Sequence, residues 1–175
     1  MTTVQEQFGD IDIYVFDQLL RGRITNGMRV FDAGCGSGRN IAYLLREGLD
    51  VRGVDMNADA IAHVRGMTTH PEHFQVEPLE AITAPNESAD VVICSAVLHF
   101  ARDDAQFNAM LLGAWRVLKP GGVFFCRLAS DIGMERRVER IEGRRFRLPD
   151  GSTRYLVDEA LLLTLTERLN RPERP

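Results

Sequence analysis

Three glycines and two aspartates carry the clearest chemical signal in this sequence of 175 residues. Gly34, Gly36 and Gly38 follow a short apolar run, and without side chains they let the backbone turn tightly and approach a ligand closely. Asp32 stands two residues before the first glycine, where a carboxylate can face a cationic or amino-bearing ligand. Asp55 ends a second apolar run, where a carboxylate can accept hydrogen bonds from both hydroxyls of an adenosine ribose. Each feature alone also fits a structural turn or a helix start, but their combination predicts a cofactor site.

The spacing of the glycines argues against one class of nucleotide site. They follow the pattern G-x-G-x-G, whereas dinucleotide-binding loops carry G-x-G-x-x-G. An aspartate at position 32 would also repel a bound pyrophosphate. A nicotinamide-dependent oxidoreductase is therefore retained only as an alternative function.

Short apolar runs alternate along the chain with runs of helical spacing. The expected strands cover residues 28–32, 51–55, 73–77, 90–95 and 123–128, and the expected helices between them cover residues 40–47, 58–64 and 103–118. Asn57 can cap the second of these helices, and Lys119-Pro-Gly-Gly122 is expected as a turn that ends the third. This alternation implies parallel pairing through right-handed crossovers, hence an open, doubly wound α/β sheet that binds ligands beyond the carboxyl ends of its strands.

Four segments resemble, in sequence and in order, the class I S-adenosylmethionine-dependent methyltransferases. They are VFDAGCGSGRN, VRGVDMNADAI, ADVVICSAVLHF and LKPGG, and the resemblance covers residues 30–128. It implies a Rossmann-like, mostly parallel sheet with strand order 3-2-1-4-5, and S-adenosylmethionine as the cofactor, with S-adenosylhomocysteine as the product. The segment from residue 132 to 160 is similar to a bacterial subgroup described as tellurite-resistance-like.

The resemblance also implies roles for individual residues. Asp32 and the glycines would hold the methionine part of the cofactor, Asp55 would take the ribose hydroxyls, and Met56 would pack on the adenine. The implied cofactor-binding residues are Asp32, Gly34, Cys35, Gly36, Gly38, Asn40, Asp55, Met56, Leu79, Glu80, Ser95 and Ala96.

One position departs from the family pattern. Many relatives carry Gly-Asp after the third strand, and that aspartate contacts the adenine amino group. This chain has Pro78 at the equivalent place, so the backbone of Leu79 or the side chain of Glu80 is expected to contact the adenine instead.

Methyl transfer from a sulfonium is an in-line displacement on an electrophile that is already activated. The protein mainly aligns donor and acceptor and excludes water, so no catalytic triad is expected. His99 and Tyr14 are the candidate catalytic residues on the acceptor side, although each also has a plain packing role. Arg127, Arg144 and Arg145 are the candidate substrate-binding residues, and no metal site is expected.

The chain is expected to form one methyltransferase-like domain over residues 1–175. Its parts are a helical cap (1–27), a cofactor-binding core (28–128), a lid or hairpin insertion (129–157) and a helix (158–170) capped by Asp158. For the antiparallel strand pair that usually completes the family's sheet, two alternatives stay open: the chain is truncated before it, or the pair is absent. The fifth strand would then be an exposed apolar edge, which predicts a homodimer through that edge.

The composition of the chain argues against two classes of function. A net charge of −4 argues against binding nucleic acid through phosphate neutralisation, and 45% hydrophobic residues without a run long enough to span a bilayer predict no membrane insertion. Three cysteines without a C-x-x-C pair fit a reducing, cytoplasmic location. The leading hypothesis is a methyltransferase for a small-molecule acceptor. A non-catalytic partner subunit that binds the cofactor or its demethylated product stays open as a second alternative.

Overall fold

The computed structural model describes residues 3–170, which fall into two compact units. The first unit runs to Val97 and includes Asn108–Arg127. The second combines Leu98–Phe107 with the chain after Arg127. Among the described residues, no helix is both long and apolar enough to cross a membrane.

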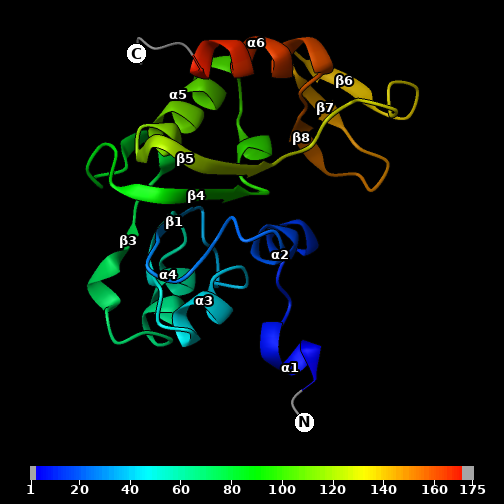
Figure 1. The fold of residues 1–175 in the computed structure, drawn as a ribbon. Helices are drawn as coiled ribbons and strands as arrows, with labels where there is room; N and C mark the ends of the chain where they lie inside the picture. The colour runs from blue at the N-terminus through cyan, green and yellow to red at the C-terminus, as the bar shows by residue number, and fades with distance from the viewer. Residues whose placement is uncertain (1–2, 171–175) are drawn as a thin grey trace. The chain divides into compact units, whose positions relative to one another are not determined.

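A five-stranded parallel sheet forms the first unit (Figure 1). Its strands are β1 (Arg29–Ala33), β2 (Asp50–Asp55), β3 (Phe74–Val76), β4 (Ala89–Ser95) and β5 (Leu118–Arg127). They lie in the order β3-β2-β1-β4-β5, so the predicted doubly wound topology is confirmed. Among the described residues, no antiparallel strand joins this sheet.

The central strands are buried because their sequences are almost continuously apolar. Four of the five residues of β1 and six of the seven residues of β4 are buried. Such runs are typical of parallel strands covered on both faces. The carboxyl ends of β1, β2 and β4 therefore present their last side chains at one edge of a rigid sheet.

The helices follow the predicted alternation with small shifts of their ends. They are α1 (Val4–Phe8), α2 (Ile13–Leu20), α3 (Ala42–Arg46), α4 (Ala58–Arg65), α5 (Asp104–Trp115) and α6 (Glu159–Leu169), with single 3₁₀ turns η1 (Pro71–His73), η2 (Leu79–Ala81) and η3 (Leu98–Phe100). Asn57 caps α4 by accepting from the N–H groups of Asp59 and Ala60, as predicted. The helix expected over 103–118 ends at Trp115, where the chain turns into β5.

The predicted turn at Lys119–Gly122 lies inside β5 instead. Leu118 pairs with Ala89 and Val123 pairs with Val91, so the four residues between them bulge out opposite Asp90. The Lys119 ammonium donates to the Asp90 carboxylate at 2.6 Å and holds the bulge against β4. The prediction of a free turn was wrong because pairing resumes on both sides of the glycines.

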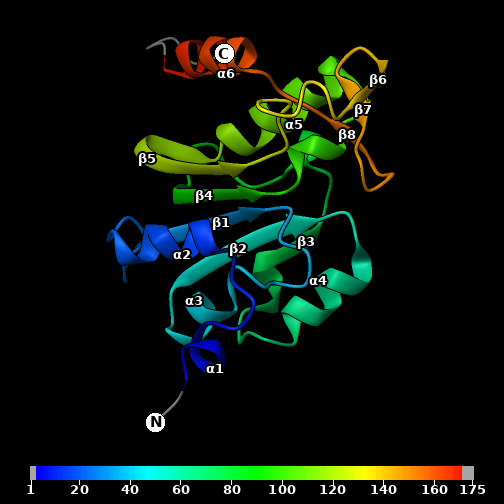
Figure 2. The ribbon, with the colours of Figure 1, turned by 90° about the vertical axis from the view of Figure 1, so that its right-hand side faces the viewer.

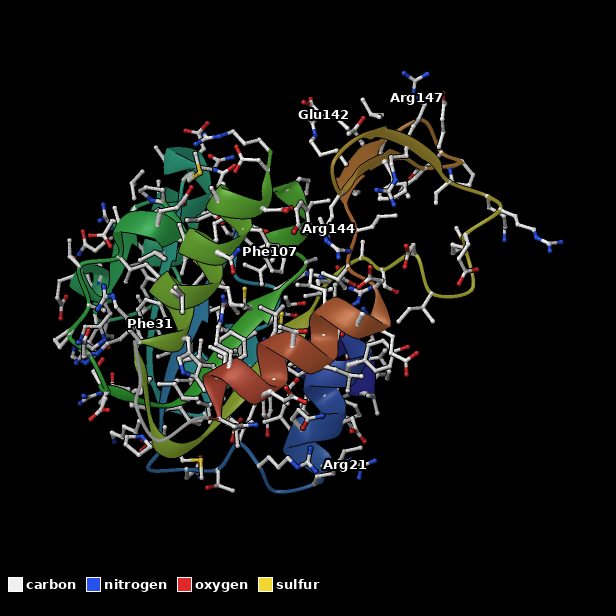
Figure 3. The ribbon with its side chains drawn as sticks, turned by 90° about the horizontal axis from the view of Figure 1, so that it is seen from above. Arg21, Phe31, Phe107, Glu142, Arg144 and Arg147 are labelled. Atoms are coloured by element: carbon white, nitrogen blue, oxygen red, sulfur yellow. The ribbon has the colours of Figure 1, made fainter. Side chains whose placement is uncertain are left out.

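The second unit contains a three-stranded antiparallel sheet of β6 (Glu139–Glu142), β7 (Arg145–Arg147) and β8 (Thr153–Tyr155). Sequence patterning predicted a hairpin around the turn at 148–152, and the structure adds β6 as a third strand. Figure 3 shows Glu142 and Arg147 pointing away from this sheet. Tyr155 is buried, stacks on Phe107 with 4.6 Å between ring centroids, and donates its hydroxyl hydrogen to Asp104 at 2.8 Å.

Candidate functional site

The glycine loop follows β1, which is labelled in Figure 2, and its glycines take positive φ values that favour glycine. Gly34 and Gly38 both have φ of +85°, and a Cβ atom on Gly34 would lie 2.4 Å from Cγ2 of Val97. The N–H groups of Gly34 and Cys35 both donate to the carbonyl of Val54, at 2.9 and 3.0 Å. The loop is thus fixed to the end of β2 and can be closely approached by a ligand.

Asp32 is a buried carboxylate without a hydrogen-bond partner in the described chain. It is 1% exposed, and neither carboxylate oxygen has a hydrogen-bond partner among residues 3–170. Burial, together with the nearby charge of Asp55 and against the opposing charge of Arg39, raises the pKa of Asp32 to about 7. A buried acid without donors is costly, so a ligand that brings a cation or a hydrogen-bond donor would offset this cost.

Asp55 joins the glycine loop to the end of β2. One carboxylate oxygen accepts from the N–H of Gly36 at 2.8 Å, and the other accepts from the N–H of Asn57 at 2.8 Å. An ionised carboxylate has about four acceptor positions, so about two remain open on a side chain that is half-buried. Those positions match the two adjacent hydroxyls of a ribose.

The end of β4 adds a third polar and strained element to the site. Ser95 is 8% exposed, and its hydroxyl has no partner among the described residues. Ala96 takes a φ of +62°, which costs an alanine roughly 1 kcal/mol or more, and its N–H donates to the carbonyl of Arg127 at 2.7 Å. Strain of this kind is typical of backbone held in place beside a ligand.

The predicted adenine-side residues lie after β2 and β3. Met56 is 71% exposed at the end of β2, so its apolar side chain is available to a ring. Leu79 is buried in η2, and Glu80 beside it is exposed. Sequence reasoning missed Gly113 of α5, where a Cβ atom would lie 1.9 Å from the carbonyl oxygen of Leu79. That glycine lets α5 press directly on the backbone of this segment.

Sequence reasoning also missed Asp12, which fixes the N-terminal segment. Its nearly buried carboxylate accepts from the Arg127 guanidinium at 2.6 Å and from the N–H of Tyr14 at 3.0 Å, and Arg39 lies 3.7 Å away. The side-chain oxygen of Asn40 accepts from the N–H of Asp12 at 3.0 Å. A short polar residue just before an apolar helix signals a cap, but no local pattern pairs position 12 with position 127.

Two residues predicted to contact ligands therefore have structural partners. Asn40 was expected beside the cofactor and Arg127 beside the substrate, and both bind Asp12. Tyr14, the candidate catalytic residue of α2, is 60% exposed. All the predicted cofactor-binding residues lie within the first unit.

The remaining predicted acceptor residues belong to the second unit. His99 lies in η3, with its ring 4.6 Å from that of Phe100. Arg144, labelled in Figure 3, lies between β6 and β7 and donates to the carboxylate of Asp158, the cap of α6, at 2.8 Å. Arg145 pairs with Tyr155 across β7 and β8.

Two aspartates at one edge of the first unit's sheet differ in burial and in hydrogen-bond partners. Asp32 is deep, unpartnered and suited to an ammonium group, whereas Asp55 is shallower, fixed by backbone donors and suited to a diol. The glycine loop lies between the two aspartates in the sequence, and without side chains it would let a ligand that reaches both carboxylates approach the backbone closely. The arrangement fits a nucleoside that carries an amino acid, and it does not fit a pyrophosphate.

Comparison with known proteins agrees with this geometry. A family model described as a methyltransferase domain matches residues 31–126. An uncharacterized methyltransferase of Synechocystis is 34% identical over 102 residues, which are 58% of this chain and 47% of that protein. A ubiquinone biosynthesis O-methyltransferase of Psychrobacter cryohalolentis is 31% identical over 106 residues, 55% of this chain and 39% of that protein. The chain thus spans less than half the length of these two relatives.

A solved structure shows the same fold. The crystal structure of a SAM-dependent methyltransferase from Methanosarcina mazei superposes with a TM-score of 0.70 over 86% of this chain and 82% of that one, at 22% sequence identity.

Proposed function

The chain belongs to the class I S-adenosylmethionine-dependent methyltransferases, and we propose that it transfers a methyl group from S-adenosylmethionine to a small-molecule acceptor. The observation that carries the proposal is Asp32, whose buried carboxylate has no partner among the described residues and lies beside the glycine loop. A positively charged amino group of the cofactor would supply the missing partner.

The residues present fit the cofactor part by part. Asp32 would accept from the ammonium group of the methionine moiety, and the open positions of Asp55 would accept from the ribose hydroxyls. Met56 would cover one face of the adenine, with the backbone of Leu79 on the segment that α5 holds in place. When bound, the cofactor supplies a sulfonium methyl group that is already electrophilic.

The protein's own part in the transfer is then positioning and exclusion of water. Ser95 and the strained Ala96 line the end of β4, where they would fix the sulfur against the acceptor. Tyr14 and His99 stay as the candidate groups for taking a proton from the acceptor, a step needed only when the acceptor must lose one.

An oxygen nucleophile is the acceptor we propose. The Psychrobacter relative, 31% identical over 106 residues, is named as an O-methyltransferase. The tellurite-resistance-like resemblance of the tail would instead point to a metalloid oxyanion, and an acceptor panel separates the two.

Calorimetric titration with S-adenosylhomocysteine tests cofactor binding. The unaltered chain should bind one equivalent, Asp55→Ala should bind at least about tenfold more weakly, and Asp59→Ala, an exposed aspartate on α4, should bind like the unaltered chain. Saturable binding that is insensitive to Asp55→Ala would contradict the assigned geometry.

Transfer itself is tested with methyl-labelled S-adenosylmethionine and a panel of phenols, carboxylic acids, thiols and metalloid oxyanions. Label should move to an oxygen acceptor. A chain that binds the cofactor tightly but labels nothing in the panel would favour the non-catalytic partner subunit. Binding of a nicotinamide dinucleotide in place of S-adenosylhomocysteine would favour the oxidoreductase.

A further inference from the structure

We propose that His70, Glu72 and His73 form a binding site for a divalent transition-metal ion. The three residues surround η1, the single 3₁₀ turn that connects α4 to β3 in the first unit. One potential ligand atom from each residue lies within 4.8 Å of the other two. The sequence analysis expected no metal site.

The distances suit a small cation. Nδ1 of His70 lies 3.2 Å from Oε1 of Glu72, and Nε2 of His73 lies 3.7 Å from the same oxygen. Two ligands bound to one tetrahedral zinc ion at its usual bond lengths are about 3.3 Å apart. The Glu72 oxygen is therefore already near the separation from each histidine that a shared ion requires, whereas the potential ligand atoms of the two histidines lie within 4.8 Å of one another.

Asp50 supplies the outer support that a metal-binding histidine usually has. Its Oδ1 lies 3.6 Å from Nδ1 of His73, the ring nitrogen opposite the one that faces Glu72. Hydrogen bonds from Arg29 and Arg52 fix the Asp50 carboxylate, at 2.6 and 3.3 Å. A carboxylate behind a histidine sets its tautomer and increases its basicity toward the metal.

The backbone that carries the ligands is held in place without the ion. The N–H of His73 donates to the carbonyl of His70, and the Gln75 side chain donates to the carbonyl of Glu72 at 2.7 Å. Two guanidinium nitrogens of Arg65 donate to the carbonyl of Phe74, at 2.9 and 2.6 Å. Little conformational entropy is lost when such ligands close on an ion.

One side chain must move for the ion to bind. The rings of His70 and His73 stack with 5.0 Å between centroids and 14° between planes. The lone pairs of their ring nitrogens lie in these nearly parallel planes and therefore do not converge on one point. His73 is 19% exposed and packed, whereas His70 is 63% exposed and can rotate. Binding should therefore replace the stacked pair by a chelate in which His70 turns toward Glu72.

The ligand set selects the class of ion. Two imidazoles and one carboxylate suit zinc, cobalt, nickel or copper, whereas calcium and magnesium prefer sites made of oxygen atoms only. Asp50, which supports the proposed site, is the first residue of β2, and Asp55 is the last residue of that strand. The two residues are separated by roughly 16 Å along the strand. All three ligands belong to η1 and its cap, directly before β3, so the ion would fix this turn, and its role would be structural.

Titration of the metal-stripped chain with zinc chloride, followed by calorimetry, tests the proposal. One equivalent should bind, and both His70→Ala and His73→Ala should weaken binding by at least about tenfold. His63→Ala removes an exposed histidine of α4 outside the cluster and should leave binding unchanged. Cobalt should give visible absorption bands that the two cluster variants lose.

A double variant keeps the test decisive if His73→Ala fails to fold. His70→Ala combined with Glu72→Gln changes two exposed side chains, so the fold should survive, as circular dichroism can verify. Zinc binding that this variant leaves intact would overturn the proposal, as would the absence of saturable binding to the unaltered chain. Cofactor binding is measured separately, so either result leaves the proposed function standing.

Discussion

Two carboxylates of the first unit, those of Asp12 and Asp32, are almost equally buried, but only the first has hydrogen-bond partners in the described chain. Asp12 accepts hydrogen bonds from Arg127 and from the N–H of Tyr14, with Arg39 nearby. Asp32 has no hydrogen-bond partner in the described chain, and its pKa is raised to about 7. The protein can thus satisfy a buried acid, and at Asp32 it does not.

The difference indicates that Asp12 serves the stability of the fold, whereas Asp32 serves ligand binding. Asp12 holds the N-terminal segment on the core, so removing it should cost stability. Asp32 costs stability as it stands, and that cost is offset only when a cationic ligand binds. Substitutions at the two positions should therefore change stability in opposite directions, and only Asp32 should control cofactor affinity directly.

A large effect on stability is expected at Gly34, where the loop packs directly against Val97. Gly34→Ala should destabilise the chain by roughly 3 kcal/mol, because the new Cβ would overlap Val97 and the φ of +85° disfavours alanine. Gly36→Ala is the matched control, since its Cβ meets nothing within 4 Å. Chemical denaturation should show a loss of only about 1 kcal/mol there. Equal losses at both positions would contradict the close-packing argument.

Asp32→Asn should lower the affinity for S-adenosylhomocysteine by about 100-fold, because a charged hydrogen bond is replaced by a neutral one. Calorimetry measures the change directly. An affinity within about twofold of the unaltered chain would mean that another group holds the amino group.

The same substitution should make the ligand-free chain more stable at pH 8. The folded-state pKa of Asp32 lies above its unfolded value, so its contribution to stability is fully present below about pH 4 and is lost as pH rises through about 7. The slope is about 1.4 kcal/mol per pH unit over that window. Thermal melts of Asp32→Asn should therefore lack this pH-dependent loss.

Asp12→Ala should destabilise the chain by about 2 kcal/mol, through the lost cap of α2 and a partly exposed ion pair with Arg127. Asp12→Asn keeps the cap and removes the charge, so it should lose about half as much. Denaturation midpoints of the two variants distinguish the contributions. A loss confined to the charge, with Asn as poor as Ala, would assign the effect to the ion pair alone.

The sequence predicted those features that depend on residues close together in the chain. The apolar runs gave the five strands and their order followed from the family resemblance, while the cap at Asn57 followed from residue type. Asp32 and Asp55 were singled out because each stands at the end of an apolar run.

The parts that sequence reasoning missed depend on distant partners. The pairing of Asp12 with Arg127 spans 115 positions, and the contact of Gly113 with Leu79 spans two elements. Strand β6 has every residue exposed, so it lacks the alternation of apolar and polar residues that marks a half-buried strand. Such features are set by tertiary packing, which a single sequence does not display.

The Asp32 carboxylate is proposed to receive the cofactor's amino group, so cofactor binding should lower its pKa. Carbon NMR of the aspartate carboxyls, titrated with pH and assigned by loss of one signal in Asp32→Asn, measures this directly. The account predicts a pKa near 7 in the ligand-free chain, falling by at least about one pH unit when S-adenosylhomocysteine saturates the site. An Asp32 pKa that saturating ligand leaves unchanged would contradict it.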